Sequence, residues 1–127
     1  MNIRVLVMGD MLVEIMREEV GVSLKEKGRF LGPYPSGAPV IFAGCLANMG
    51  LYTSFVGSVG DDEFGEAILE RLDRDGVDTD KVQVLEDETT GVAFVTYFVN
   101  GDRKFIFHAK NAAAGKVDEN IIRKDYF

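Results

Sequence analysis

The sequence predicts an α/β fold, in which helices connect the strands of a parallel sheet and an antiparallel β appendage is added. Two observations favour this class. Apolar, strand-like runs alternate with helical segments along much of the chain, as in βαβ units. Two runs rich in aromatic and β-branched residues then flank Asn100-Gly101, a dipeptide typical of β-hairpins. With 127 residues and 46% hydrophobic content, the chain is large enough to form the core of one domain.

The first strand is expected at Arg4–Gly9, a short apolar run that ends in glycine. The range Met11–Met16 is expected to form a second strand that carries one inward-facing acid, Glu14. The charged range Arg17–Arg29 then indicates a solvated loop or a hairpin connection.

Two helices are expected. The first begins at Ser36–Pro39, where proline is tolerated because its missing N–H needs no partner in a first turn, and it ends at Gly50. It has few polar positions, so we expect it to be buried against a sheet. The second follows Asp61–Glu63, whose carboxylates favour the positive helix end, and it stops at Gly76. The strands expected before and after it are Thr53–Val59 and Lys81–Leu85.

The predicted hairpin consists of Gly91–Val99 and Arg103–His108. Both faces of its first strand are apolar, although a sheet that is covered on one side needs only one apolar face. We therefore expect the second face to meet a ligand, another domain or a partner subunit. The tail from Val117 is predicted to begin a helix.

The net charge of −7 argues against nucleic acids and anionic membranes as partners, because both are negatively charged and bind positively charged protein surfaces. Small-molecule chemistry is favoured instead. Prolines and glycines interrupt the longest uncharged stretch, Leu31–Val59, so no transmembrane helix is predicted. No secretory cleavage site follows the short apolar run at the start, and we expect a cytoplasmic location.

Few residues are candidates for chemistry. Cys45 is expected to be a small buried hydrophobe rather than a nucleophile, and His108 is expected to end a strand. A glycine-rich turn at residues 57–65 is where a phosphate could sit, but the acids Asp61–Glu63 would repel it, so a structural turn is favoured. Asp10 lies past the carboxyl end of the first strand, where open α/β sheets bind ligands, and Glu14 follows it closely.

Four segments, taken together, resemble the ribokinase-like (PfkB-type) carbohydrate kinases and cover nearly the whole chain. They are VMGDMLVEI, PSGAPVIFAGCLANMG, FVGSVGDDEFGEAILERLDRDGV and TTGVAFVTYFVNGDRKFIFH. The third is the most specific, with its spaced glycines and the closing Asp75-Gly76-Val77. The resemblance implies that residues 1–127 form the N-terminal part of a sugar kinase domain. This part would belong to a ribokinase-like three-layer core, with a small antiparallel β lid formed by residues 11–34 and 91–108, approximately.

The resemblance also implies a sugar site. In this family the first strand and the glycine-led helix face the sugar, and the lid closes over it. The matching substrate-binding positions are Asp10, Glu14, Gly37, Ala38, Phe107 and Lys110. The chain departs from the family pattern at three positions. Ser36 replaces a glycine, Ile41 replaces an asparagine, and Ala109 replaces an arginine, with Lys110 next to it as a substitute.

The activity implied by the resemblance is transfer of a phosphoryl group from ATP, with Mg²⁺, to a sugar hydroxyl. The segment TTGVAFVTY is more similar to fructokinase and 2-keto-3-deoxygluconate kinase relatives than to nucleoside kinases, which favours a ketose or a keto sugar acid. The family's glycine-rich signature with its catalytic Asp has no match, since Asp78-Thr79-Asp80 lacks the glycines that follow. We therefore expect a fragment without the ATP-binding part and without a catalytic residue. It would bind no ATP or Mg²⁺ alone and would form a homodimer through the lid.

Two other functions stay open. One is a non-catalytic sugar-binding or dimerisation module, which would bind sugar without ATP hydrolysis even in the complete protein. The other, a dinucleotide-dependent oxidoreductase, is disfavoured because Val7–Asp10 lacks the three-glycine fingerprint.

Overall fold

The computed structural model describes residues 3–121, and it confirms the predicted mixed α/β class. Its strands are β1 (Arg4–Met8), β2 (Leu12–Arg17), β3 (Phe30–Ser36), β4 (Tyr52–Gly60), β5 (Asp78–Leu85), β6 (Gly91–Tyr97) and β7 (Arg103–His108). Its helices are α1 (Ala38–Asn48) and α2 (Glu63–Asp75), followed by the short 3₁₀ helices η1 (Ala113–Gly115) and η2 (Glu119–Ile121). Most of the helix expected from Val117 lies outside the described residues.

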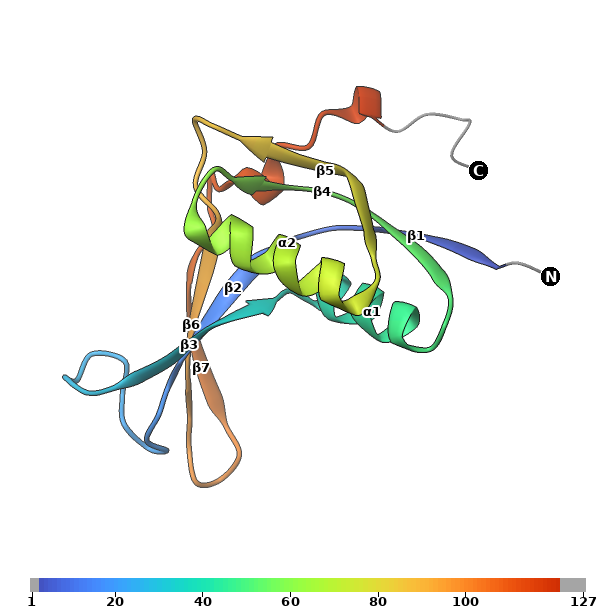
Figure 1. Cartoon of the computed structure of the whole chain (residues 1–127). Coiled ribbons are helices and arrows are strands. Elements are labelled where there is room, and N and C mark those ends of the chain that lie inside the picture. Colours follow the sequence, from blue (N-terminus) through green and yellow to red (C-terminus); the bar gives the residue numbers. More distant parts are fainter. Residues whose placement is uncertain (1–2, 122–127) are drawn as a thin grey trace.

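A three-stranded parallel sheet in the order β1-β4-β5 forms the centre of the fold. The connections from β1 to β4 and from β4 to β5 advance in the same direction across this sheet. Right-handed crossovers therefore place α1 and α2 on one face of it (Figure 1). The buried core includes Val7, Phe55, Val59, Ile68 and Leu72. Among residues 3–121, no helix is long and apolar enough to cross a membrane.

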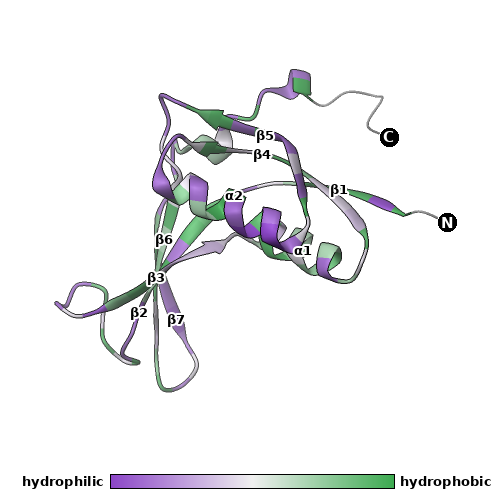
Figure 2. Ribbon diagram, in the orientation of Figure 1, coloured by the Kyte–Doolittle hydropathy of each residue, from purple (hydrophilic) through white to green (hydrophobic). Residues whose placement is uncertain are grey.

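A second sheet of four strands extends away from the helices in the order β3-β2-β6-β7 (Figure 1), and we call it the lid sheet. Its outer pairs, β2–β3 and β6–β7, are antiparallel, but the central strands β2 and β6 run parallel. The lid sheet is therefore mixed rather than wholly antiparallel. The reason is that β2 follows β1 and β6 follows β5, and these two parallel strands end at the same edge. The central strands are largely hydrophobic (Figure 2), and Val13, Ala93 and Val95 are buried.

The sequence does not predict β3 as a strand. Gly32, Pro33 and Pro35 interrupt its pattern, and proline has no N–H to donate to a neighbouring strand. The structure accommodates them because β3 lies at the edge of the lid sheet, where one side of the strand needs no partner.

Helix α1 is buried on one side only. Val40 and Ala43 face the core, whereas Ile41 and Phe42 are 56% and 54% exposed. Cys45 is also exposed, so the prediction that it is buried is wrong. It lies one helical turn after Ile41 and therefore on the same outward side.

The predicted hairpin is present as β6 and β7, with His108 as the last residue of β7. Its loop spans residues 98–102. The N–H of Phe98 donates to the carbonyl of Asp102 at 2.8 Å, and the N–H of Gly101 donates to that of Phe98 at 2.9 Å. Gly101 has a φ of 87°, which glycine adopts without strain.

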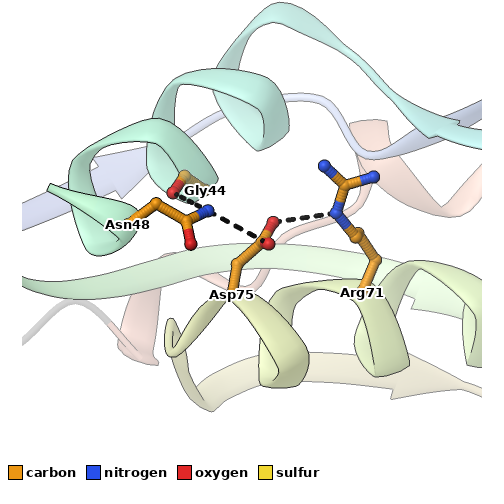
Figure 3. A network of polar contacts seen from close by, with 4 residues as sticks. All are labelled: Gly44, Asn48, Arg71 and Asp75. Atoms are coloured by element: carbon orange, nitrogen blue, oxygen red, sulfur yellow. Dashed lines mark hydrogen bonds and ion pairs between the residues drawn. The ribbon is translucent and has the colours of Figure 1, made fainter.

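Asp75, at the end of α2, links the two helices (Figure 3). Its carboxylate accepts hydrogen bonds from Nδ2 of Asn48 at 3.1 Å and from Nε of Arg71 at 2.9 Å. A β-carbon at Gly44 would lie 2.6 Å from Oδ2 of Asp75. Glycine at position 44 therefore allows α1 and α2 to approach this closely.

Asp62 joins the parallel sheet to the lid sheet. It caps α2, where its Oδ1 accepts from the N–H of Gly65 at 2.8 Å, and its Oδ2 accepts from the N–H of Thr90 at 2.8 Å, just before β6. The hydroxyl oxygen of Thr90 accepts in turn from the N–H of Gly60, at the end of β4. Burial favours a raised pKa for Asp62, but the hydrogen bonds from Thr90 and Gly65 outweigh it and lower the pKa below its ordinary value.

The variant Asp62→Asn tests this junction. An amide offers one acceptor oxygen, so one N–H loses its partner, and we expect the free energy of unfolding at neutral pH to fall by about 1–3 kcal/mol. Because the folded-state pKa of Asp62 is lowered, its stabilisation is present above the unfolded-state pKa of about 3.9 and is lost as the pH falls through the folded-state value. Urea unfolding should show a difference between variant and wild type that shrinks below about pH 4.

The matched control is Asp61→Asn, since Asp61 is a neighbouring, exposed acid. It should change the free energy of unfolding by no more than about 0.5 kcal/mol. An equal loss in both variants would show that the carboxylate of Asp62 is not the link.

Candidate functional site

The candidate site lies where the end of β1 meets the start of α1. Gly37 precedes α1 with a φ of 100°, and a β-carbon there would lie 2.6 Å from the backbone oxygen of Asp10. A β-carbon at Gly9, which has a φ of 149°, would lie 2.5 Å from Cγ of Pro39. Two glycines thus let the helix start approach the strand end. Asp10, Gly37 and Ala38 are consequently neighbours at the carboxyl edge of the parallel sheet.

Glu14 is held beside this junction by Ser36. The register of β2 and β3 places Ser36 opposite Leu12. Leu12 lies two residues before Glu14 in β2. Ser36 as a whole is 8% exposed, and its hydroxyl donates to Oε2 of Glu14 at 3.2 Å. The other carboxylate oxygen of Glu14 has no hydrogen-bond partner within residues 3–121.

Phe107 lies on the same face of the lid sheet as Glu14. Glu14 is paired with Ala93 and Ala93 with Phe107, and partners in a register point to one face. Phe107 is 61% exposed, and its ring stacks on Phe105 with the centroids 5.3 Å apart. Lys110 is exposed beyond the end of β7, and no hydrogen bond or ion pair in the described part of the chain ties it to these residues.

Four of the predicted site positions, Asp10, Glu14, Gly37 and Ala38, therefore cluster at one place. From the sequence, Ser36 is notable only because it replaces a glycine of the family pattern, and its contact with Glu14 is not predicted. That contact depends on the pairing of β2 with β3, so a correct prediction of β3 would have been the signal needed to find it.

The glycine-rich turn after β4 is packed against protein atoms. A β-carbon at Gly60 would lie 2.5 Å from the carbonyl of Glu88, and one at Gly65 would lie 2.4 Å from the carbonyl of Gly60. This agrees with a structural turn rather than a phosphate cradle. Residues 3–121 also contain no group of three side chains that could hold a metal ion.

Comparison with protein families decides the assignment. Residues 2–127 match the family described as pfkB family carbohydrate kinase. The chain belongs to this family. Its members are transferases, so the predicted kinase class is confirmed at the level of the family.

One curated relative and two crystal structures illustrate the match of this pfkB family chain. Fructokinase-2 of Oryza sativa subsp. japonica is 38% identical over 83% of this chain and 31% of that protein. A crystal structure of the E. coli protein described as "putative Ribokinase II", in its apo form, is 43% identical and superposes with a TM-score of 0.92 over 97% of this chain and 40% of that chain. A second structure under that name, in complex with ATP and Mg²⁺, is 47% identical with a TM-score of 0.85 over 93% of this chain and 39% of that chain. The pfkB family chain thus spans less than half the length of these relatives.

The variant Gly37→Ala tests the close approach at the site. We expect it to destabilise the protein by about 1–3 kcal/mol more than Gly21→Ala does. Of these two glycines, only Gly37 would bring an added β-carbon against the backbone of another segment. Both glycines have a positive φ, 100° and 86°, and Gly21 has nothing within 4 Å of an added β-carbon. The difference in urea unfolding between the two variants therefore measures the contact with Asp10. Equal losses would mean that the backbone at Asp10 can move away at no cost.

Proposed function

We propose that the complete protein transfers a phosphoryl group from ATP to a hydroxyl of a ketose or a keto sugar acid, with this chain supplying the sugar-binding side. The observation that carries the proposal is the match of residues 2–127 to a carbohydrate kinase family. Two acids support it. Asp10 follows β1 at the carboxyl edge of the parallel sheet, where ligands bind in open α/β sheets, and Glu14 lies close by in β2 of the lid sheet. The rice fructokinase among the relatives supports a ketose as the phosphoryl acceptor. The related structure in complex with ATP and Mg²⁺ supports ATP as the phosphoryl donor.

In this proposal the residues of the chain bind and orient the acceptor. The carboxylates of Asp10 and Glu14 accept hydrogen bonds from sugar hydroxyls, and the backbone at Gly37 and Ala38 lies against the sugar. Phe107 covers the sugar from the lid sheet, which excludes water as a competing acceptor. Lys110 is the candidate cation near the substrate. Mg²⁺ bound with ATP would supply charge neutralisation, which together with positioning accounts for most of the catalysis in phosphoryl transfer.

We propose that the residues which bind ATP and Mg²⁺, and the catalytic base, lie outside these 127 residues. The share of the relatives that the chain spans supports this, at 31% of the rice fructokinase and 40% of the E. coli protein. We also propose a cytoplasmic location, because ATP is available there to a sugar kinase.

The lid sheet favours a homodimer, and a dimerisation or sugar-binding module without catalysis is therefore the second candidate function. One face of the sheet carries four large apolar side chains that are partly exposed. They are Leu31 at 38%, Tyr34 at 46%, Phe105 at 37% and Phe107 at 61%. A second copy of the lid sheet would remove this apolar face from water.

The first test is ADP release by the complete protein with Mg²⁺ and ATP and a panel of ketoses, keto sugar acids and nucleosides. We expect turnover that depends on a ketose or a keto sugar acid, and none with nucleosides. The 127-residue chain alone should be inactive. Sugar binding without turnover in the complete protein would select the non-catalytic module, and no response to any sugar would contradict the proposal.

The second test is sedimentation velocity on the complete protein, which we expect to behave as a dimer. Phe105→Ser should shift it toward the monomer, because a polar side chain weakens the contact between apolar faces. Val99→Ser is the control, since Val99 lies in the hairpin loop and is 92% exposed. A monomeric wild type would exclude dimerisation through the lid.

A further inference from the structure

Ser36 and Glu14 form a polar pair beside the buried centre of the fold. Ser36 is 8% exposed, and its hydroxyl donates to Oε2 of Glu14 at 3.2 Å. A hydroxyl that is largely removed from water needs such a partner. The hydrogen bond also sets the orientation of the carboxylate, because it fixes which of the two oxygens is turned toward Ser36.

The backbones on both sides of this hydrogen bond are fixed. A β-carbon at Gly32 would lie 2.8 Å from the carbonyl oxygen of Glu14, so β2 and β3 are pressed together there. Ser36 directly precedes Gly37, whose added β-carbon would lie 2.6 Å from the carbonyl oxygen of Asp10. The remaining freedom of Glu14 is therefore in its side-chain torsions, and the hydroxyl of Ser36 restricts them.

The second oxygen of the carboxylate is left for a ligand. Within the described residues, Oε1 of Glu14 accepts no hydrogen bond, and Glu14 shares a face of the lid sheet with Phe107. The neighbouring strand end contributes another acid, Asp10. A sugar hydroxyl can donate to such an oxygen, whereas a substrate carboxylate at this point would meet like charge.

We propose that Ser36 is a positioning residue that holds the Glu14 carboxylate ready for a sugar hydroxyl, so that the site favours a neutral ketose over a keto sugar acid. The inference rests on the sugar kinase function proposed above. Ser36 contacts neither the sugar nor the reacting atoms. Its effect is on acceptor binding, because a carboxylate that is already oriented loses less conformational freedom when the sugar binds.

The experiment is steady-state kinetics of the complete protein with D-fructose and with 2-keto-3-deoxygluconate. Ser36→Ala should raise KM for fructose about five- to tenfold and leave kcat within about twofold, since the interaction is made equally in the ground state and the transition state. Ser36→Thr keeps the hydroxyl and should restore KM to within about twofold of wild type, a rescue that a packing role alone would not give. Glu14→Gln removes the charge and should reduce the preference for fructose over the sugar acid.

The matched control is Ser54→Ala. Ser54 is 6% exposed and donates to Oδ2 of Asp78 at 3.0 Å, at the start of β5. The variant loses a hydrogen bond from a serine hydroxyl to a carboxylate, as Ser36→Ala does, but at a place outside the candidate site. Thermal unfolding should register it, while KM for fructose should not change.

The outcomes separate this inference from the proposed function. Turnover with an unchanged KM in Ser36→Ala would overturn the inference and leave the function intact. If the wild type phosphorylates no sugar but calorimetry shows fructose binding that Ser36→Ala weakens by the expected factor, the function fails and the positioning role holds. Absence of both fructose binding and turnover in the wild type would overturn both.

Discussion

The carboxylate of Asp62 is the point on which the arrangement of the two sheets depends. It caps α2 and accepts from the N–H of Thr90, while Thr90 accepts from Gly60 at the end of β4. The neighbouring glycines are required by the same junction, because a β-carbon at Gly65 would meet the carbonyl of Gly60 at 2.4 Å. Since β6 begins directly after Thr90, one side chain sets where the lid sheet leaves the parallel sheet.

A second junction holds the other central strand of the lid sheet. The end of β1 is packed against the start of α1 through Gly9 and Gly37, and β2 begins just after Asp10. The lid sheet is thus attached at two places on the carboxyl edge of the parallel sheet, and glycines allow close packing at both. The candidate site lies at the junction between β1 and α1, so its geometry depends on the backbone more than on any single side chain.

Local patterns predict much of this fold, and contacts between distant segments account for what they miss. The periodicity and the capping residues of α2, and the turn dipeptide Asn100-Gly101, act within a few residues, so both elements are visible in the sequence. Strand β3 is hidden by its prolines, which only its edge position permits. The exposed side of α1, with Cys45, cannot be inferred from an apolar composition, because composition does not say which neighbours are present. The pairing of Ser36 with Glu14 requires knowledge of a strand register that no local pattern contains.

The parallel pairing of β2 with β6 has a consequence for how the chain folds. It joins Ile15 to Phe94, so the central pair of the lid sheet closes a loop that contains most of the parallel sheet and both helices. Such a closure is slow compared with formation of α2 or of the β6–β7 hairpin, which depend on local contacts. On the ribosome, β2 emerges long before β6, and until then it presents an unpaired and largely apolar edge. During synthesis β2 can therefore pair with a wrong strand before β6 is available, and slower translation after β5 would prolong this period.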